Sequence, residues 1–273
     1  MPVFSVDPAT CIKCGICSQV CPSSIIAAVR GKLPRMRKRR EDDCIACGHC
    51  MINCPTGAAH VDVLPDRQVQ AVNKALVPGP EAVDMLCKSR RSVRRFAREP
   101  VDKTAIAAIM DVARFAPTAK NGQPFRWIGL YERSRLQQLG DLMADWHEHL
   151  IATASSLMPL QKLKLLAKAW RAGDDPYFRG APHLILAVTP KDDAWEGVDS
   201  AIALTYLELA AAGRGIGCCW AGYVTMAARQ YPPIGELLGL RDEEIVSGGQ
   251  MLGHPQFTPR AIPPRKKLDM TWI

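Results

Sequence analysis

Eight of the eleven cysteines fall into two copies of one pattern, Cys-x2-Cys-x2-Cys-x3-Cys-Pro. Three thiolates on such a tight loop can cap three irons of a cubane iron–sulfur cluster, while a fourth thiolate arrives from elsewhere in the chain. Gly15 and Gly48 allow the loops to turn around a cube, and Pro22 and Pro55 end each run with a fixed φ. The spacing therefore predicts two 4Fe-4S clusters on the eight ligands Cys11, Cys14, Cys17, Cys21, Cys44, Cys47, Cys50 and Cys54.

Two other uses of cysteine compete with this interpretation, structural disulfides and zinc. Zinc sites usually take two Cys-x2-Cys pairs separated by about a dozen or more residues, and they need no third cysteine followed by x3-Cys-Pro. Disulfides would require export, but residues Met1 to Thr10 carry no basic stretch followed by an apolar core. We therefore expect no signal peptide, and clusters are favoured.

Residues 1 to about 60 resemble a bacterial-type ferredoxin with two 4Fe-4S clusters. The resemblance implies that the fourth cysteine of each run serves the other cluster. One cluster is then held by Cys11, Cys14, Cys17 and Cys54. The second is held by Cys44, Cys47, Cys50 and Cys21.

Such a ferredoxin is complete within that stretch, so the rest of the chain must bury a second core. Val77-Pro78-Gly79-Pro80 favours a break in regular structure. We therefore predict a ferredoxin-like domain at 1–62, a linker at 63–80 and a second domain at 81–273. No apolar run reaches the roughly 18 residues needed to cross a bilayer.

Hydrophobic periodicity in the second domain predicts a sheet covered by helices. Helices are expected at Glu81–Cys87, Ala105–Phe115 and Ser200–Gly213, and a buried strand at His183–Thr189. Periodicity alone therefore supports a mixed fold of helices and strands. Two further helical stretches are expected around Ile151 to Gln161.

An arginine-rich run, Arg90-Arg91-Ser92-Val93-Arg94-Arg95-Phe96, follows the first of these helices. The guanidinium fork matches phosphate oxygens in a bidentate way, and a serine hydroxyl can add a further hydrogen bond. The run therefore favours an anionic ligand. Taken alone, it would equally suit a solvated helix end or a contact with nucleic acid.

Three further blocks follow this run in the chain, and together the four blocks resemble the FMN-dependent nitroreductase family. They are Ala116-Pro117-Thr118-Ala119-Lys120-Asn121-Gly122-Gln123-Pro124, Gly215-Ile216-Gly217-Cys218-Cys219-Trp220 and Gly253-His254-Pro255. The resemblance spans about residues 80–273. It implies a three-layer α+β domain that forms a homodimer with flavin at the subunit interface.

The resemblance also implies which residues hold FMN. Arg90, Arg91, Ser92 and Arg94 would contact the phosphate and the polar edge of the isoalloxazine. Pro117, Thr118, Asn121 and Gln123 would reach the flavin from the partner subunit. Cys219, Trp220 and Ala221 would lie beside the reactive N5, and Arg265 would close over the phosphate.

The chain departs from the family where His254 stands in place of a common tyrosine, and this histidine is expected to be structural. Cys218 and Cys219 could suggest redox chemistry, but neighbouring cysteines rarely form a relaxed disulfide, so packing is favoured. No catalytic side chain is expected, because the flavin carries the chemistry.

The region Asp141 to Arg179 corresponds to the part of the family fold that shapes the pocket above the flavin. It supplies candidates for substrate contact, though packing or surface roles are favoured for each singly. These candidates are His147, His149, Trp170, Tyr177 and Phe178.

The formal net charge is +8, and two oxidised clusters at about −2 each would bring it to roughly 8 − 4 = +4. Overall basicity is therefore only a weak argument for nucleic acid binding, and no nucleic-acid partner is expected. Between the cluster motifs lies a basic loop, Gly31 to Arg40. It could steer an acidic ferredoxin or flavodoxin towards a cluster, or it could be a solvated insertion.

Clusters pass single electrons, whereas FMN accepts electrons singly and can release two together. We therefore expect an FMN-dependent oxidoreductase that links an external donor, reduced ferredoxin or NAD(P)H, to a nitroaromatic, quinone-like or other conjugated acceptor. The alternative is an electron-transfer flavoprotein that hands electrons to a partner redox protein. A nucleic-acid-binding regulator is disfavoured by the flavin blocks. Cluster cysteines imply a reducing compartment, so a cytoplasmic protein is expected, with no membrane partner.

Overall fold

The computed structural model describes residues 3–64, 69–154 and 158–273. The remaining residues fall within the expected ferredoxin-like domain, linker and Ile151–Gln161 stretch, and lie outside the described residues. The chain divides into two compact units. Unit 1 comprises residues 1–77 together with 119–122, and unit 2 comprises residues 78–118 and 123–273.

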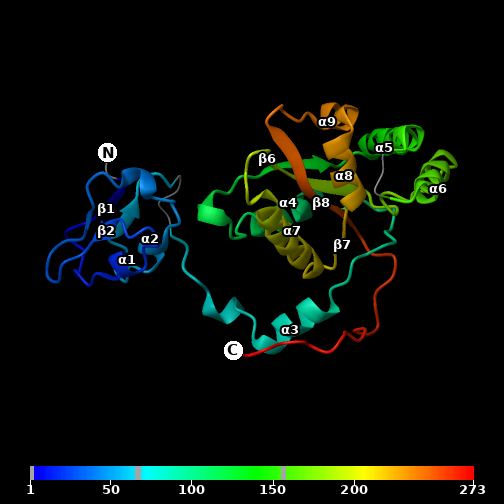
Figure 1. Cartoon of the computed structure of the whole chain (residues 1–273). Coiled ribbons are helices and arrows are strands. Elements are labelled where there is room, and N and C mark those ends of the chain that lie inside the picture. Colours follow the sequence, from blue (N-terminus) through cyan, green and yellow to red (C-terminus); the bar gives the residue numbers. More distant parts are fainter. Residues whose placement is uncertain (1–2, 65–68, 155–157) are drawn as a thin grey trace. The chain divides into compact units, whose positions relative to one another are not determined.

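Unit 1 consists of short elements around two ligand loops (Figure 1). The terminal strands of its ferredoxin portion pair in antiparallel fashion, Phe4 opposite Val61, and a second small hairpin pairs Ile26 with Met36. The elements are β1 (Phe4–Val6), α1 (Ile16–Gln19), β2 (Ile26–Ala27), β3 (Arg35–Met36), η1 (Glu41–Asp43), α2 (His49–Ile52), β4 (Ala59–Val61), η2 (Lys74–Leu76) and η3 (Ala119–Asn121).

The internal repeat of unit 1 is visible in its two one-turn helices. Gly15 precedes α1 with a φ of 77°, and Gly48 precedes α2 with a φ of 71°. Only glycine adopts this left-handed conformation freely, so each glycine reverses the chain between the second and third cysteines of its motif. Cys17 and Cys50 are thereby buried against the core formed by Phe4, Ile25, Ile26, Met51, Ala59 and Val61.

Unit 2 contains a four-stranded antiparallel sheet in the order β5-β6-β8-β7. The strands are β5 (Arg126–Leu130), β6 (His183–Pro190), β7 (Gly217–Trp220) and β8 (Glu244–Gly253). The helices are α3 (Pro80–Ser89), α4 (Lys103–Ala113), α5 (Arg133–Thr153), α6 (Leu160–Arg171), α7 (Glu196–Ala212), α8 (Gly222–Gln230) and α9 (Pro232–Leu238).

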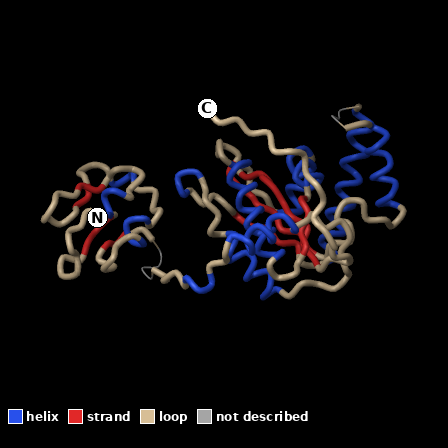
Figure 2. Tube along the Cα trace, turned by 90° about the horizontal axis from the view of Figure 1, so that it is seen from below, coloured by secondary structure: helices blue, strands red, loops and turns tan. Residues whose placement is uncertain are grey.

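The sheet is the middle layer because helices cover both of its faces (Figures 1 and 2). Along β6, Leu184, Leu186 and Val188 belong to the core shared with α5, α8 and α9. Ile185 and Ala187 alternate with them and belong to the core shared with α4 and α7. Alternation with a period of two, with both faces buried, explains why this strand is apolar throughout. The expected α+β class is confirmed.

The predicted elements of unit 2 are found close to their expected positions. The helices expected from Glu81, Ala105 and Ser200 are α3, α4 and α7, and the buried strand is β6. The region from Asp141 onward is occupied by α5 and α6, which pack against each other. Within the described ranges, no helix has both the length and the apolar character to span a membrane.

Candidate functional site

The eight motif cysteines are free thiols that line two cavities in unit 1. One cavity is lined by Cys11, Cys14, Cys17 and Cys54. The other is lined by Cys21, Cys44, Cys47 and Cys50. Each cavity thus combines three thiols of one motif with the fourth of the other, which is the exchange that the ferredoxin resemblance implies. Four soft thiolate ligands around a cavity fit a 4Fe-4S cluster.

The thiols need deprotonation before they can bind iron. Among the described residues, no three cysteine, histidine or carboxylate side chains converge on a single metal ion; each set of four thiols is arranged around its cavity. Burial, reinforced by the neighbouring thiol of Cys47, raises the pKa of Cys50 to about 11. Cluster assembly therefore releases protons.

In unit 2 the arginine-rich run lies along the edge strand β7. The backbone N–H of Val93 donates a 2.8 Å hydrogen bond to the carbonyl oxygen of Cys218. A Cβ at Gly217 would lie only 2.4 Å from Cγ2 of Val93, so only glycine lets the run approach this closely. Gly217, in the third sequence block, therefore positions the arginine-rich run, which is the first block.

The segment after β8 completes this arrangement. The N–H of Ala97 donates to the carbonyl of His254 at 2.8 Å, and the N–H of Gln256 donates to the carbonyl of Arg95 at 3.0 Å. Three of the four sequence blocks therefore meet at one place. Here His254 acts through its backbone, in keeping with the expected structural role.

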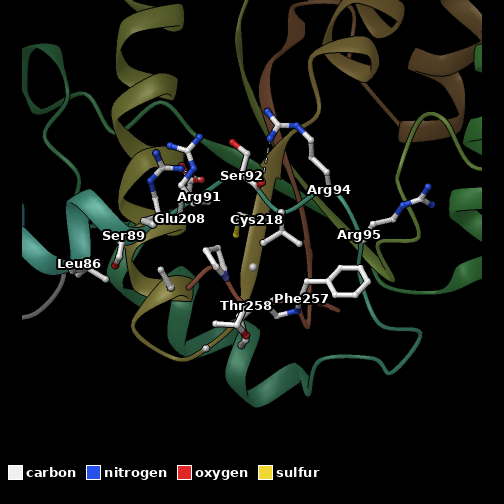
Figure 3. Close-up of a pocket in the computed structure, with 18 residues that line it drawn as sticks. Leu86, Ser89, Arg91, Ser92, Arg94, Arg95, Glu208, Cys218, Phe257 and Thr258 are labelled. Carbon is white, nitrogen blue, oxygen red and sulfur yellow. Dashed lines mark hydrogen bonds and ion pairs between the residues drawn. The ribbon is translucent and has the colours of Figure 1, made fainter. Parts of the chain in front are cut away.

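These segments enclose a pocket of about 410 Å³ (Figure 3). Arg91, Ser92 and Arg94 lie on one side of it, and Phe257 and Thr258 lie on the opposite side. The lining residues are Leu86, Ser89, Arg90, Arg91, Ser92, Val93, Arg94, Arg95, Glu208, Ala212, Gly215, Ile216, Gly217, Cys218, Pro255, Phe257, Thr258 and Pro259.

Four guanidinium groups give the pocket a cationic wall, and one carboxylate balances part of this charge. Oε1 of Glu208, on α7, lies 2.7 Å from Nη1 of Arg90. The Glu208 side chain is 7% exposed and that of Arg90 is 26% exposed, so the ion pair anchors the guanidinium from the protein side. Among the described residues, Arg90 forms its one ion pair with Glu208, which leaves further N–H groups of the guanidinium for a ligand.

The donor set of this pocket fits a phosphorylated cofactor such as FMN. Guanidinium groups and serine hydroxyls supply hydrogen bonds to phosphate oxygens, while Val93, Ile216 and Pro255 supply apolar walls. The volume lies within the roughly 300–1,000 Å³ common for ligand sites.

The second sequence block, 116–124, does not line this pocket. Its segment 119–122 belongs to unit 1, where Nδ2 of Asn121 donates to the carbonyls of Ile45 and Ala46 at 3.0 and 3.1 Å. The N–H of Gln123 donates to Oγ1 of Thr118 at 3.0 Å, and Pro117 is exposed. Lys120, Asn121 and Gln123 all have positive φ, a concentration of strain typical of functional loops.

The cysteine pair in β7 is divided between the two faces of the sheet. Cys218 packs in the core on the α4–α7 side, and Cys219 packs on the α5–α8 side. Burial raises the pKa of both thiols. They are therefore neutral packing residues, and the disulfide alternative is disfavoured by geometry. Trp220 is 41% exposed and Ala221 is buried, and neither lines the pocket.

Two groups of predicted residues lie away from the pocket. Arg265 lies in the exposed segment that follows β8, where the chain from Gln256 onward forms neither helix nor strand. His147, Trp170, Tyr177 and Phe178 are buried in the core beside α5 and α6, and His149 is exposed. Nδ1 of His147 lies 3.0 Å from the hydroxyl of Tyr177.

The sequence predictions included only four of the residues that line the pocket, Arg90, Arg91, Ser92 and Arg94. Those missed that carry charged, hydroxyl or aromatic side chains are Ser89, Arg95, Glu208, Phe257 and Thr258. A signal for Glu208 exists, since it is the only charged residue between Ser200 and Gly213 in an otherwise apolar helix. Ser89 and Arg95 flank residues already predicted. Nothing in the sequence distinguishes Phe257 and Thr258 from other residues of the proline-rich tail.

Residues 87–254 match the model of the Nitroreductase family, and residues 5–61 match that of the 4Fe-4S dicluster domain. A putative NADH dehydrogenase/NAD(P)H nitroreductase of Streptomyces griseus is 27% identical over 147 residues, covering 52% of this chain and 72% of that protein. The 5,6-dimethylbenzimidazole synthase of Rhodospirillum rubrum is 27% identical over 152 residues, covering 51% and 68%. The crystal structure of an FMN-bound nitroreductase from Bacteroides fragilis superposes with a TM-score of 0.59 at 20% identity, covering 71% of this chain and all of that one.

Proposed function

Because the chain belongs to the nitroreductase family of FMN-dependent oxidoreductases and begins with a 4Fe-4S dicluster domain, we propose that it is an iron–sulfur flavoenzyme. It takes electrons from an external donor, reduced ferredoxin or NAD(P)H. It delivers them to a nitroaromatic, quinone-like or other conjugated organic acceptor. The observation that carries this proposal is the presence, in one chain, of two four-thiol cavities and an arginine-lined pocket.

In this proposal the pocket residues bind and orient the flavin. Arg90, Arg91 and Arg94 hold the phosphate, and the hydroxyl of Ser92 adds a hydrogen bond. Glu208 fixes the direction of the Arg90 guanidinium through the 2.7 Å ion pair. Phe257 and Thr258 cover the opposite side of the pocket and reduce the access of water.

The bound groups supply the redox chemistry: clusters exchange single electrons, and FMN can gather two for transfer to an organic acceptor. The protein then supplies position and electrostatics and needs no acid–base side chain in the pocket. Cys218 lines the pocket, but burial raises the pKa of its thiol and keeps it neutral. It therefore supplies no base in the pocket, in agreement with a protein that only positions the bound groups.

A homodimer with FMN at the subunit interface belongs to the same proposal. Helix α3 buries none of its residues and exposes Val83 and Met85. The tail likewise exposes Leu268 and Trp272. A second copy would cover these apolar surfaces and would bring Pro117, Thr118, Asn121 and Gln123 of the partner subunit to the flavin, and Arg265 would close over the phosphate. The eleven free thiols suit a reducing compartment, so we place the protein in the cytoplasm.

The electron path is tested by following flavin and cluster absorbance without oxygen. We expect bleaching when NADH, NADPH or enzymatically reduced ferredoxin is added, and reoxidation when a quinone or nitroaromatic is supplied. Reduction without any turnover of small acceptors would overturn the enzyme proposal in favour of an electron-transfer flavoprotein.

The pocket assignment is tested with Arg94→Ala. Loss of one charge-assisted interaction should weaken FMN binding about tenfold or more, as measured by the recovery of flavin fluorescence on dissociation. Arg114→Ala, which removes an exposed arginine at the C-cap of α4, is the matched control. Full FMN occupancy in Arg94→Ala would contradict the phosphate role.

A further inference from the structure

The two ligand loops of unit 1 differ in exposure although they are copies of one motif. In the first loop Ile12 is 62% exposed, and Lys13 and Cys14 are exposed beside it. At the equivalent positions of the second loop, Ile45, Ala46 and Cys47 are only partly exposed. The side chain of Asn121, which belongs to the same unit, also donates hydrogen bonds to the carbonyl oxygens of Ile45 and Ala46. The first ligand loop is therefore the more exposed of the two at these positions.

A basic hairpin borders the cavity that lies beside this exposed loop. Strands β2 and β3 form it, pairing Ala27 with Arg35. Pro34 is buried and lines the same cavity as Cys14 and Ile12. A Cβ on Gly15 would lie 3.5 Å from that of Ala28, so the hairpin also packs against the first ligand loop.

The hairpin carries an unusual concentration of positive charge. Seven of the eleven residues from Arg30 to Arg40 are basic, and all seven side chains are exposed. None of the residues between them is acidic. Arg40 is paired with Asp43 and also donates to the carbonyl of Ser23 at 3.2 Å. Among the described residues, no other ion pair involves this stretch. Glu41 and Asp42 follow it and reduce the net charge without reversing it.

Exposed apolar side chains accompany these cations. Val29 is 58% exposed and Leu33 is 39% exposed, both in the connection between the two strands. Together with Ile12 they provide apolar contact area within a charged surface, the composition expected of a protein–protein docking site. The stretch from Ile26 to Asp43 contains no aromatic residue, whereas single-stranded nucleic acid is usually held by stacking on aromatic side chains.

We infer that the surface formed by Ile12, Lys13 and residues 28–40 is the docking site of an acidic protein that carries single electrons. We name it the basic docking surface. The inference rests on the proposed function, in which the clusters receive electrons from outside. Docking here would bring the donor's redox centre to the cavity of Cys11, Cys14, Cys17 and Cys54. One electron would then pass from the donor to the 4Fe-4S cluster that these four thiolates would hold, and no bond is made or broken.

The test is a binding measurement that needs no turnover. The holoprotein and an acidic bacterial 2[4Fe-4S] ferredoxin, both oxidised, are titrated by calorimetry at about 0.01 M and about 0.15 M salt, where the Debye lengths are about 30 and 8 Å. We expect binding that weakens with salt. The combined variant Arg35→Gln, Arg37→Gln, Lys38→Gln and Arg39→Gln should bind at least about tenfold more weakly at low salt.

Two controls isolate the basic docking surface. A variant that loses the same charge elsewhere, Lys164→Gln, Lys168→Gln, Lys266→Gln and Lys267→Gln, should bind like the parent. The same ferredoxin with its carboxylates amidated should bind poorly. Reduction of the clusters by dithionite, followed by electron paramagnetic resonance, establishes that both variants retain their clusters.

Equal affinity of the parent and the hairpin variant would overturn the inference, as would undiminished binding of the amidated ferredoxin. So would salt-sensitive binding of a duplex or single-stranded oligonucleotide that the hairpin variant loses while the ferredoxin fails to bind. A failure of the proposed function gives a different result. With dithionite as the reductant, no organic acceptor would be turned over, whether or not ferredoxin binds.

Discussion

Replacing Gly217 with alanine should separate the arginine-rich run from the sheet. The new Cβ would lie 2.4 Å from Cγ2, 3.0 Å from Cβ and 3.3 Å from Cγ1 of Val93. Overpacking of this kind costs about 1–3 kcal/mol, and loss of the Val93 N–H to Cys218 hydrogen bond adds about 1 kcal/mol. The expected loss of folding free energy is therefore about 2–4 kcal/mol, with FMN affinity reduced about tenfold or more as Arg91 and Arg94 move.

A second substitution makes the reasoning testable. Val93→Ala removes the contacts at 2.4 and 3.3 Å and leaves only the one at 3.0 Å. Alone it should cost about 1 kcal/mol through lost apolar burial. Combined with Gly217→Ala it should restore part of the stability and FMN affinity, so that the double variant is at least about 1 kcal/mol more stable than the sum of the single effects predicts.

Tryptophan fluorescence during urea unfolding is the appropriate assay, because all six tryptophans belong to unit 2. The matched control is Gly197→Ala in α7, where a new Cβ meets nothing within 4 Å and stability should be unchanged or slightly higher. Strictly additive effects of Gly217→Ala and Val93→Ala would refute the steric explanation. So would an FMN affinity that is unaffected by Gly217→Ala.

Three further predictions concern protonation and ligand exchange. Burial lowers the pKa of His147 from 6.5 to about 4, so the unfolded chain binds this proton more tightly. Stability of unit 2 should fall by up to about 3 kcal/mol between pH 6.5 and about 4, and His147→Phe should remove this slope in urea unfolding. The hydrogen bonds from Arg126 lower the pKa of Glu244 from 4.5 to about 2. The stability that ionised Glu244 adds to the fold is therefore fully present above pH 4.5 and is lost as the pH falls towards 2. Arg126→Ala should cost about 2–3 kcal/mol at pH 7, and an unchanged urea midpoint would contradict it. Cys54→Ser should deplete the cluster bound by Cys11, Cys14 and Cys17, giving about half the iron, with the loss confined to one paramagnetic signal; loss of the other cluster would disprove the exchange.

Local patterns in the sequence were sufficient for the regular elements and for part of the pocket. The apolar run of β6 predicts a strand that is buried on both faces, and the spacing of apolar residues in α4 and α7 predicts helices with one buried stripe. Few other secondary structures fit these patterns. The run from Arg90 to Phe96 was predicted as an anion site from residue type alone. Its position on β7 depends on Gly217, which the sequence contains but does not connect with Val93.

What could not be predicted depends on contacts between residues far apart in the chain. Glu208 lies more than one hundred residues from its partner Arg90, and periodicity only marks it as anomalous in an apolar helix. The hydrogen bonds of Asn121 to the second ligand loop likewise follow from tertiary structure. Left-handed backbone at Lys120 and Gln123 has no signature in the residue type, and at Asn121 only the general tolerance of asparagine for this conformation points to it.

The edge position of β7 has a consequence for the behaviour of the protein in solution. β7 is the last strand of the sheet, and its outer side would be open to another chain if the segment around Val93 did not cover part of it. Uncovered edges are templates for intermolecular pairing. The same segment thus lines the pocket and shields the sheet from aggregation. With the flavin in this pocket, as proposed, a chain that loses this segment's attachment would lose its cofactor and its colloidal stability together, so bound flavin would protect the folded protein during expression and storage.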